Sequence, residues 1–364
     1  MKSLTYFYVT VLLLVWMCSC SNDSYQQELN SGSNKKQRQA FSYLSGNTMG
    51  TKYHVSYQDK RKRTFQTDID LLLAEINQEV STYEENSVIS QFNKAKVDTF
   101  WFDEASFSGI SSNFKHFIVN FQLAKKVYEV SQGAMDPTVM PLVNYWGFGY
   151  TEKSVVTSVD SANVRELKKL IGFDKVQLIQ SPRMGLTKAN PDVQLDFSAF
   201  AKGYGVDAVS DFLMDQGVEN FFVEIGGEVR VHGVNPEGIP WRIGINVPLE
   251  SASTGDIFKV LPLKDKAIAT SGNYRNYREV KGKKYGHTID PKTGYPEKNN
   301  LLSASVISDE CIVSDAFATA CMVVGVDEAI KMAEQVPYID VYLIYGKDDG
   351  TMGVKKSRGL KVQD

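Results

Sequence analysis

The sequence has few cysteines, few histidines and no excess of positive charge. Its four cysteines are too few for a disulfide framework, and they include no Cys-x-x-Cys pair. Its four histidines disfavour a histidine-rich metal cage, so any metal is expected on oxygen ligands. With 40 basic and 43 acidic residues the net charge is −3, and nucleic acid is not an expected partner. The 43% apolar and 23% charged residues are globular proportions, which exclude collagen, coiled coil and disorder throughout.

Long hydrophobic runs are also missing, apart from a short one at the N-terminus. Lys2 precedes an apolar run at residues 4–17, which is shorter than the roughly 20 residues that cross a bilayer and is typical of a signal peptide. The run ends in Cys18-Ser19-Cys20, and a small residue before a cysteine is typical of a bacterial lipoprotein cleavage site. We therefore expect residues 1–19 to be a lipoprotein signal peptide and Cys20 to be lipidated. An ordinary secretory signal and a short uncleaved anchor are the alternatives.

A polar segment follows the expected signal peptide. Residues 20–40 contain almost nothing that could be buried, and we expect a flexible tether. A chain of this length reaches roughly 25 Å on average. The folded body, residues 41–364, is therefore expected close to a membrane surface.

The body mixes helical and strand-like patterns. A capping-box-like Thr67-Asp68-Ile69-Asp70 predicts the start of a helix, with Ile69, Leu72, Leu73, Ile76 and Val80 as its apolar positions. No regular βα alternation is present, and no Gly-x-Gly-x-x-Gly follows a strand, so the fold class is mixed α/β (α+β) and not a Rossmann domain. Further helices are expected at 111–131, 161–171, 199–216 and 314–324. Strands are expected at 221–225, 229–232, 241–247, 257–263, 267–270, 302–307 and 341–345, with a hairpin of 176–179 and 193–197 over the loop 182–190.

Polar residues gather first at LDFSAFAKGYG (195–205). An apolar strand is expected to end here and a helix to begin near Ala199. The amide groups of a helix N-terminus suit a phosphate, and Lys202 would add a cation one turn later. The alternative is a helix N-cap at Ser198 with a solvated lysine.

A second candidate is GHTIDPKTGYP (286–296). Pro291, Gly294 and Pro296 predict a rigid turn after His287. Histidine has an ordinary pKa of about 6.5, which suits a general base. The alternative is a stable loop in which Asp290 binds backbone amides.

A third candidate is SDAFATA (314–320). On a helix, Asp315 and Thr319 are four residues apart and share one face. A carboxylate and a hydroxyl so placed could take two corners of an octahedral Mg²⁺ site. The alternative is Ser314 as N-cap, with Asp315 facing the helix dipole and Thr319 buried.

Other segments are weaker candidates. The glycine turns at 224–228 and 270–275 could bring backbone close to a ligand, or could simply be tight turns. The aromatic loop at 134–149 could line a pocket for a planar ligand. Cys311 and Cys321 are expected as small buried residues, although a disulfide between them is possible in an exported protein.

Together and in this order, these segments resemble the ApbE family, the FAD:protein FMN transferases. Any one stretch is unspecific, whereas their combination is specific and covers nearly all of residues 45–330. The matching stretches are TMGT (48–51), STYEENSVIS (81–90), AMDPTVMPLVNYWGFG (134–149), DFSAFAKGYGVD (196–207), EIGGEV (224–229), ATSGNYRNY (269–277), HTIDPKTGYP (287–296) and SDAFATACMVVG (314–325).

The resemblance implies a fold and a reaction. It implies two α/β subdomains that bind FAD in the cleft between them, with the diphosphate on a divalent cation, usually Mg²⁺. A threonine or serine hydroxyl of a partner protein attacks the FMN phosphorus, AMP leaves, and FMN remains on the partner as a phosphoester. No enzyme nucleophile is needed.

The resemblance also assigns residues by position. It implies that the metal ligands are Asp315, Thr319 and the backbone carbonyl of Ala199, and that the base is His287. The FAD-contacting residues that it implies are Met49, Tyr83, Ala134, Met135, Asp136, Asp196, Lys202, Ser271, Gly272 and Ile289.

Members of this family are usually exported and tethered to a membrane, and they modify subunits of membrane redox complexes. With the N-terminal signal, this implies a location on the periplasmic side of a bacterial inner membrane, anchored through lipidated Cys20. Two other functions remain open. A metal-dependent FAD pyrophosphatase that gives FMN and AMP would need the same site. A non-catalytic FAD-binding lipoprotein would not need His287 or the Asp315 and Thr319 pair.

Overall fold

The computed structural model describes residues 40–361, except 103–106, 108–112, 150–158, 254, 274–276 and 281–282. The expected signal peptide, Cys20 and all but the last residue of the expected tether lie outside these residues. Every described residue belongs to one compact unit, Gln39–Asp364. In the described part of the chain, no helix combines the length and the apolar character needed to cross a membrane.

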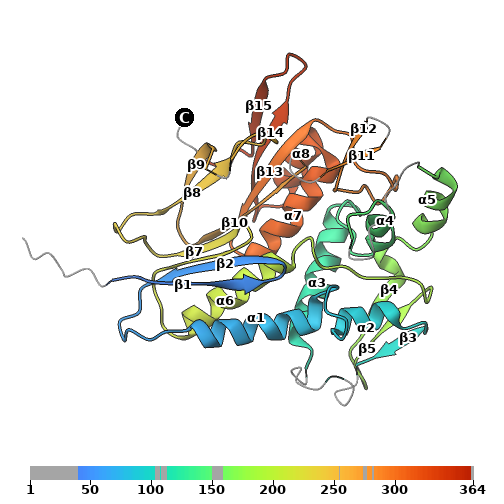
Figure 1. Ribbon diagram of the computed structural model, residues 1–364, viewed down its shortest axis with the longest axis horizontal. Helices are drawn as coiled ribbons and strands as arrows, with labels where there is room; N and C mark the ends of the chain where they lie inside the picture. Colours follow the sequence, from blue (N-terminus) through green and yellow to red (C-terminus); the bar gives the residue numbers. More distant parts are fainter. Residues whose placement is uncertain are drawn as a thin grey trace, which may run out of the picture. The chain divides into compact units, whose positions relative to one another are not determined.

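The fold is mixed α/β, as expected (Figure 1). The helices are α1 (Gln66–Val80), α2 (Val88–Lys94), α3 (Lys115–Val130), α4 (Met140–Tyr145), α5 (Ser161–Lys168), α6 (Ala201–Asp215), α7 (Cys311–Val324) and α8 (Val326–Gln335). The strands are β1 (Ser42–Thr48), β2 (Thr51–Tyr57), β3 (Thr99–Trp101), β4 (Val176–Ile179), β5 (Gly185–Lys188), β6 (Phe221–Ile225), β7 (Glu228–His232), β8 (Trp241–Asn246), β9 (Ile257–Leu263), β10 (Lys266–Gly272), β11 (Tyr277–Val280), β12 (Lys283–Gly286), β13 (Leu301–Ser308), β14 (Asp340–Gly346) and β15 (Met352–Lys356).

The largest sheet has eight strands in the order β1-β2-β6-β7-β10-β13-β14-β15, and every neighbouring pair is antiparallel. Helices α6 and α7 pack against each other and against the middle strands, while α8 packs on β14 and α1 on α6 (Figure 1). Helix α7 is apolar around most of its circumference because it packs on β10 and β13 of the sheet and also contacts α6 and α8. A charged side chain on this helix is therefore an exception that needs an explanation.

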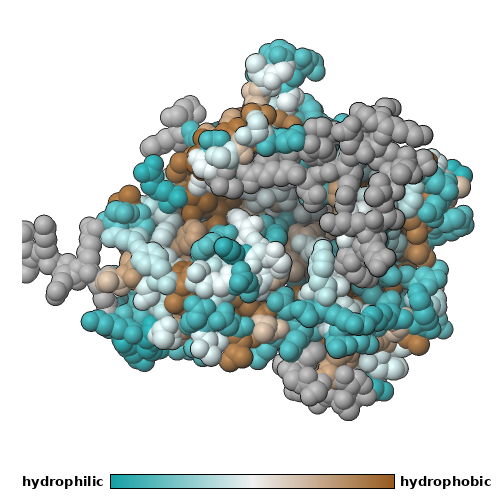
Figure 2. Space-filling model, viewed as in Figure 1, coloured by the Kyte–Doolittle hydropathy of each residue, from teal (hydrophilic) through white to brown (hydrophobic). Residues whose placement is uncertain are grey.

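The hairpin β8–β9 covers part of the opposite face of the large sheet. Trp241, Ile245 and Leu261 belong to an apolar cluster that includes Val231 of β7 and Ile344 of β14. Figure 2 shows apolar surface in the region of β8 and β9, where some aliphatic side chains remain exposed. The hairpin contributes to stability and lies apart from the polar residues singled out in the sequence.

A smaller part of the fold consists of the sheet β3-β5-β4 with α2, α3, α4 and α5. Its core joins that of the large sheet: Phe117 and Phe121 of α3 belong to the same buried cluster as Phe197 and Phe317. The segment 134–148 lines the same cavity as the N-terminus of α6 and one face of α7. Both parts thereby contribute to one site.

The predicted pairing of 176–179 with 193–197 is wrong. Strand β4 pairs with β5, which lies inside the expected loop. Residues 193–197 form no strand, although Val193, Leu195 and Phe197 are buried as their alternation suggests. The amide side chain of Asn93 binds both the backbone N–H (2.7 Å) and the carbonyl (2.8 Å) of Leu195, and so replaces a neighbouring strand.

The predicted helix starts also need correction. Helix α1 begins at Gln66 after Phe65 with no side-chain cap, so the capping box at 67–70 is not formed. Helix α6 begins at Ala201, and the Ser198 hydroxyl donates to Asp196 at 2.6 Å instead of capping the helix. Helix α7 begins at Cys311, so Ser314 lies in its first turn and contacts the hydroxyl of Ser308 at 2.7 Å.

Candidate active site

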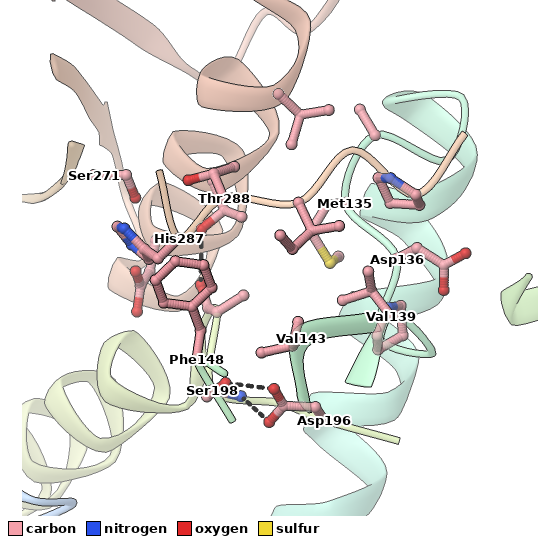
Figure 3. Close-up of a pocket in the computed structure, with 18 of the residues that line it drawn as sticks. Met135, Asp136, Val139, Val143, Phe148, Asp196, Ser198, Ser271, His287 and Thr288 are labelled. Carbon is pink, nitrogen blue, oxygen red and sulfur yellow. Dashed lines mark hydrogen bonds between the residues drawn. The ribbon is translucent and has the colours of Figure 1, made fainter. Parts of the chain in front are cut away.

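One cavity of about 420 Å³ collects most of the predicted site residues (Figure 3). Its volume is in the range of small-molecule and cofactor sites. The predicted residues that line it are Ala134, Met135, Asp136, Asp196, Ala199, Lys202, Ser271, Gly272, His287, Ile289, Asp315 and Thr319. The cleft therefore combines the loop before α4, the N-terminus of α6, the end of β10, the loop after β12 and one face of α7.

Met49 and Tyr83 lie in an adjoining pocket of about 510 Å³, which shares Asp196 and Lys202 with the first. Met49 occupies the two-residue turn between β1 and β2, with a φ of 49°, and the following Gly50 has a φ of 72°. Positive φ at both central positions is typical of the hairpin turns that match strand twist. Two pockets joined at Asp196 and Lys202 suit a long ligand with two ends.

The expected metal donors converge where α7 passes the N-terminus of α6. The Thr319 hydroxyl donates to the Ala199 carbonyl oxygen at 3.5 Å. The Asp315 carboxylate is only 3% exposed and accepts the Gly203 backbone N–H at 3.0 Å. A carboxylate, a hydroxyl and a carbonyl oxygen form the hard oxygen donor set that Mg²⁺ takes, with water and phosphate to complete it.

The charges around Asp315 are unbalanced. Lys202 Nζ lies 2.8 Å from Glu228 Oε1 and 3.8 Å from Asp315 Oδ2, so one ammonium serves two buried carboxylates. Burial, and then the charge of Asp315, raise the pKa of Glu228, although the Lys202 ammonium opposes both. Burial also raises the pKa of Asp315, and Lys202 offsets this only in part. The charge of Asp315 is thus neutralised only in part by Lys202, so the residues present fit a divalent ion.

Lys202 is held in its charged form. Burial on its own disfavours the ammonium, but the carboxylates of Asp315 and Glu228 outweigh it and raise the pKa of Lys202 above its usual value. Its side chain is still 29% exposed, toward the cleft. Within the described ranges no group of three or more His, Cys, Asp and Glu side chains could hold a metal ion, so any cation here depends on hydroxyl and carbonyl oxygens as well.

Two other acidic residues in the cleft are engaged by local turns. Asp196 accepts the backbone N–H of Ser198 at 3.0 Å as well as its hydroxyl. Asp136 accepts both the backbone N–H and the hydroxyl of Thr138, at 2.8 and 2.6 Å. Burial raises the pKa of Asp136 to about 6 and also raises that of Asp196. These carboxylates shape the backbone around the cleft and are less suited than Asp315 to bind a cation.

His287 lies on the side of the cavity formed by the segment after β12. Figure 3 shows it beside Ser271, Thr288 and Phe148, across the cavity from Met135 and Val139. Its ring is 6.3 Å from that of Phe148, in an edge-on arrangement. The following loop forms a turn, in which the Gly294 N–H donates to the Asp290 carbonyl at 2.8 Å. The Asp290 carboxylate accepts the backbone N–H of Lys292 at 2.9 Å, as in the alternative given for this segment. His287 therefore lies in the cavity wall, just before a hydrogen-bonded turn.

Comparison with known proteins identifies the family. Residues 49–343 match the model of the ApbE family. The chain belongs to this family. Its relatives in the ApbE family include proteins named FAD:protein FMN transferase. The one from Vibrio cholerae is 38% identical over 321 residues, which cover 85% of this chain and 88% of the relative. The one from Haemophilus influenzae is 37% identical over 330 residues, which cover 88% of this chain and 91% of the relative.

Solved ApbE structures also resemble this chain. The flavin transferase ApbE from Vibrio cholerae superimposes with a TM-score of 0.75 at 35% identity, over 88% of this chain and 97% of that one. The apo flavinyl transferase ApbE from Pseudomonas stutzeri gives 0.73 at 28% identity, over 88% and 95%. The resemblance found in the sequence and the expected fold class are thereby confirmed.

Sequence reasoning missed residues that position the ApbE site. Asp207 of α6 accepts the backbone N–H groups of Cys311 and Ile312, both at 2.8 Å, and so caps α7 from a neighbouring helix. Arg230 of β7 pairs with Asp207 at 3.0 Å. Glu228 was noted only as part of a glycine turn. A carboxylate directly after Gly-Gly was the available signal, but its partner is set by tertiary contacts.

The two cysteines of α7 match the simpler expectation. Cys311 and Cys321 are both free and buried. Burial, with the nearby carboxylate of Asp207, raises the pKa of the Cys311 thiol, and burial raises that of Cys321 to about 12. Protonated, enclosed thiols are unreactive, so these residues contribute packing.

Proposed function

We propose that this chain transfers FMN from FAD to a threonine or serine hydroxyl of a partner protein and releases AMP, with a divalent cation, Mg²⁺ in the first instance. Membership of the ApbE family and the names of its relatives support this reaction. The observation that carries it is the convergence of Asp315, Thr319 and the Ala199 carbonyl in the same cavity as Lys202 and His287.

The residues of the two pockets would have different roles in binding FAD. Lys202 would bind the diphosphate through its ammonium, since it lines both adjoining pockets where FAD would lie extended. Met49 and Tyr83 would contact one end of FAD, and the loop at 134–136 the other. Phosphoryl transfer depends on positioning and charge neutralisation more than on covalent help from the enzyme.

His287 is the proposed base. A threonine hydroxyl is a weak nucleophile until its proton is accepted. The oxygen of the acceptor would form the new bond to the FMN phosphorus as the bond to the AMP oxygen breaks, and the hydroxyl proton would pass to His287. Asp315, Thr319 and Ala199 would hold the cation, which when bound neutralises charge on the diphosphate oxygens.

The acceptor and the location belong to the same proposal. We infer that the acceptors are exposed subunits of membrane redox complexes and that the chain is anchored on the periplasmic side of the inner membrane by a lipid on Cys20. The apolar run at residues 4–17, the Cys18-Ser19-Cys20 sequence and the polar segment that follows support this. Mass spectrometry of the protein purified from membranes would test it: an unmodified Cys20, or an N-terminus upstream of it, contradicts the anchor.

The experiment that tests the reaction separates three activities. Purified chain, FAD and Mg²⁺ are incubated with an acceptor domain, and the acceptor mass and the AMP are measured. An acceptor heavier by one FMN phosphoester, with equal AMP, is expected. AMP and free FMN without an adduct would identify a pyrophosphatase instead. Retained FAD that yields no AMP with any divalent ion would identify a binding protein.

A further inference from the structure

Glu228 is a buried carboxylate of the cleft that the proposed reaction leaves without a role. It is 4% exposed and lines the cavity. One oxygen, Oε1, binds Lys202 Nζ at 2.8 Å. The other, Oε2, is buried without a hydrogen-bond partner among the described residues. Such an arrangement is unfavourable in itself, which indicates that the carboxylate has another function.

The backbone fixes Glu228 close to Lys202. Gly226 and Gly227 form the turn between β6 and β7, with φ of 59° and 105°, and Glu228 pairs with Ile225 directly after it. A Cβ added at Gly226 would come within 3.3 Å of the Lys202 side chain. The turn therefore packs along the lysine stem while the following carboxylate binds its ammonium.

Lys202 has two carboxylates within reach and is bound to only one of them. Its ammonium is 2.8 Å from Glu228 but 3.8 Å from Asp315, which instead accepts the Gly203 N–H. Without the charge of Glu228, Asp315 would be the ammonium's nearer anionic partner. The lysine would then compete with a cation for the same carboxylate.

We propose that Glu228 is a positioning residue that holds the Lys202 ammonium away from Asp315 and thereby keeps Asp315 available to the divalent cation. The inference rests on the proposed function, because it takes Asp315 as a metal ligand. It gives a role to a residue that is not among the proposed ligands of the cation. It also explains why a buried carboxylate lies beside Lys202.

The affinity for a metal ion, measured under conditions in which no reaction occurs, tests this role. Mn²⁺ replaces Mg²⁺, ADP replaces FAD as a diphosphate with no FMN to transfer, and free Mn²⁺ is measured by electron paramagnetic resonance with the purified full chain. Glu228→Gln keeps the shape and an acceptor for Lys202 but removes the charge. We expect its Mn²⁺ affinity to fall about 10- to 100-fold, the range found when groups that orient metal ligands are lost.

A double variant separates the indirect role from a direct one. In Lys202→Met no ammonium competes for Asp315, so adding Glu228→Gln should leave the Mn²⁺ affinity of Lys202→Met unchanged. Glu219→Gln is the matched control, because Lys60 and Glu219 form a pair of the same 2.8 Å length on the exposed surface. It should bind Mn²⁺ like the wild type.

Three results would overturn the inference. Wild-type affinity in Glu228→Gln would show that Asp315 needs no protection from Lys202. A further loss when Glu228→Gln is added to Lys202→Met would show that Glu228 acts on the cation directly. Absence of Mn²⁺ binding by the wild type would reject the metal site itself, and the failure would then lie with the proposed function.

Discussion

Gly203 is the position where a single methyl group would test the geometry of the site. It lies in the first turn of α6, against the start of α7. A Cβ built there would come within 2.5 Å of the Cys311 carbonyl oxygen and 2.8 Å of the Asp315 Cβ. Real Cβ contacts of this kind do not occur, and the closer atom is backbone, so Gly203→Ala must push α6 and α7 apart.

The size of the effect follows from these contacts. Overpacking a core costs about 1–3 kcal/mol, while alanine is favoured over glycine in a helix by about 1 kcal/mol. The net loss of stability should therefore be no more than about 2 kcal/mol, and the variant should fold. The separation also breaks the Gly203 N–H bond to Asp315. A displacement of about 1 Å at a catalytic group can lower a rate about 100-fold.

Gly205→Ala is the matched control in the same helix. A Cβ there would meet the ends of Met49, Ile225 and Leu73 side chains at 3.0–3.5 Å, all of which can move. We expect AMP release from FAD in the presence of acceptor to fall about 100-fold in Gly203→Ala and far less in Gly205→Ala, with thermal melting to show that both are folded. Equal rates in the two variants would refute the argument that the spacing of α6 and α7 sets the position of Asp315.

Three further predictions concern single side chains. Asp315→Ala should abolish turnover even in excess Mg²⁺, because the cation loses its anionic ligand; full activity there would reject the metal assignment. His287→Ala should still bind FAD, measured by flavin fluorescence, but lose transfer; loss of FAD binding would make His287 structural. Glu79, 1% exposed, accepts the Phe117 N–H, and burial raises its pKa from 4.5 to about 7. The folded state therefore binds more protons between these values, so stability falls as pH rises through this range, by up to about 3 kcal/mol. Glu79→Gln should remove this part of the fall, measured by urea unfolding at pH 5 and pH 8; curves parallel to the wild type would contradict it.

The sequence predicted the elements that carry the site because each has a strong local signal. The apolar periodicity of α1 indicated Ile69, Leu72, Leu73, Ile76 and Val80, and all of these except the half-buried Leu72 are buried. The Gly-Gly turn before Glu228 is present at the predicted place. Such local patterns predict helices correctly because tertiary packing buries the same apolar face that the periodicity indicates.

Strand pairing was less predictable than strand character. The alternation of Val193, Leu195 and Phe197 indicated correctly which side chains are buried. It could not indicate that the amide of Asn93, about a hundred residues away, would take the place of a neighbouring strand. Burial depends on the side chains of a segment, whereas backbone hydrogen bonding depends on whichever polar group the fold brings alongside.

The N-termini of the helices at the site were likewise not predictable from the local sequence. Ser198 and Ser314 each satisfy a local rule for an N-cap, yet Ser198 binds Asp196 and Ser314 lies inside α7. The cap that α7 uses is Asp207 on α6, which accepts two of its first amides. A cap supplied by another helix leaves no signal in the sequence around the helix start.

The same contact has a consequence for function. Asp207 and Gly203 are four residues apart on α6, and both bind α7: one holds the first amides of α7, the other admits Asp315 at close range. The proposed metal donors therefore lie on α7 and at Ala199, two residues before α6, and the two helices are joined at two points. Because one junction holds these donors, we expect their geometry to be set before a ligand arrives, which is the preorganisation that the proposed phosphoryl transfer requires.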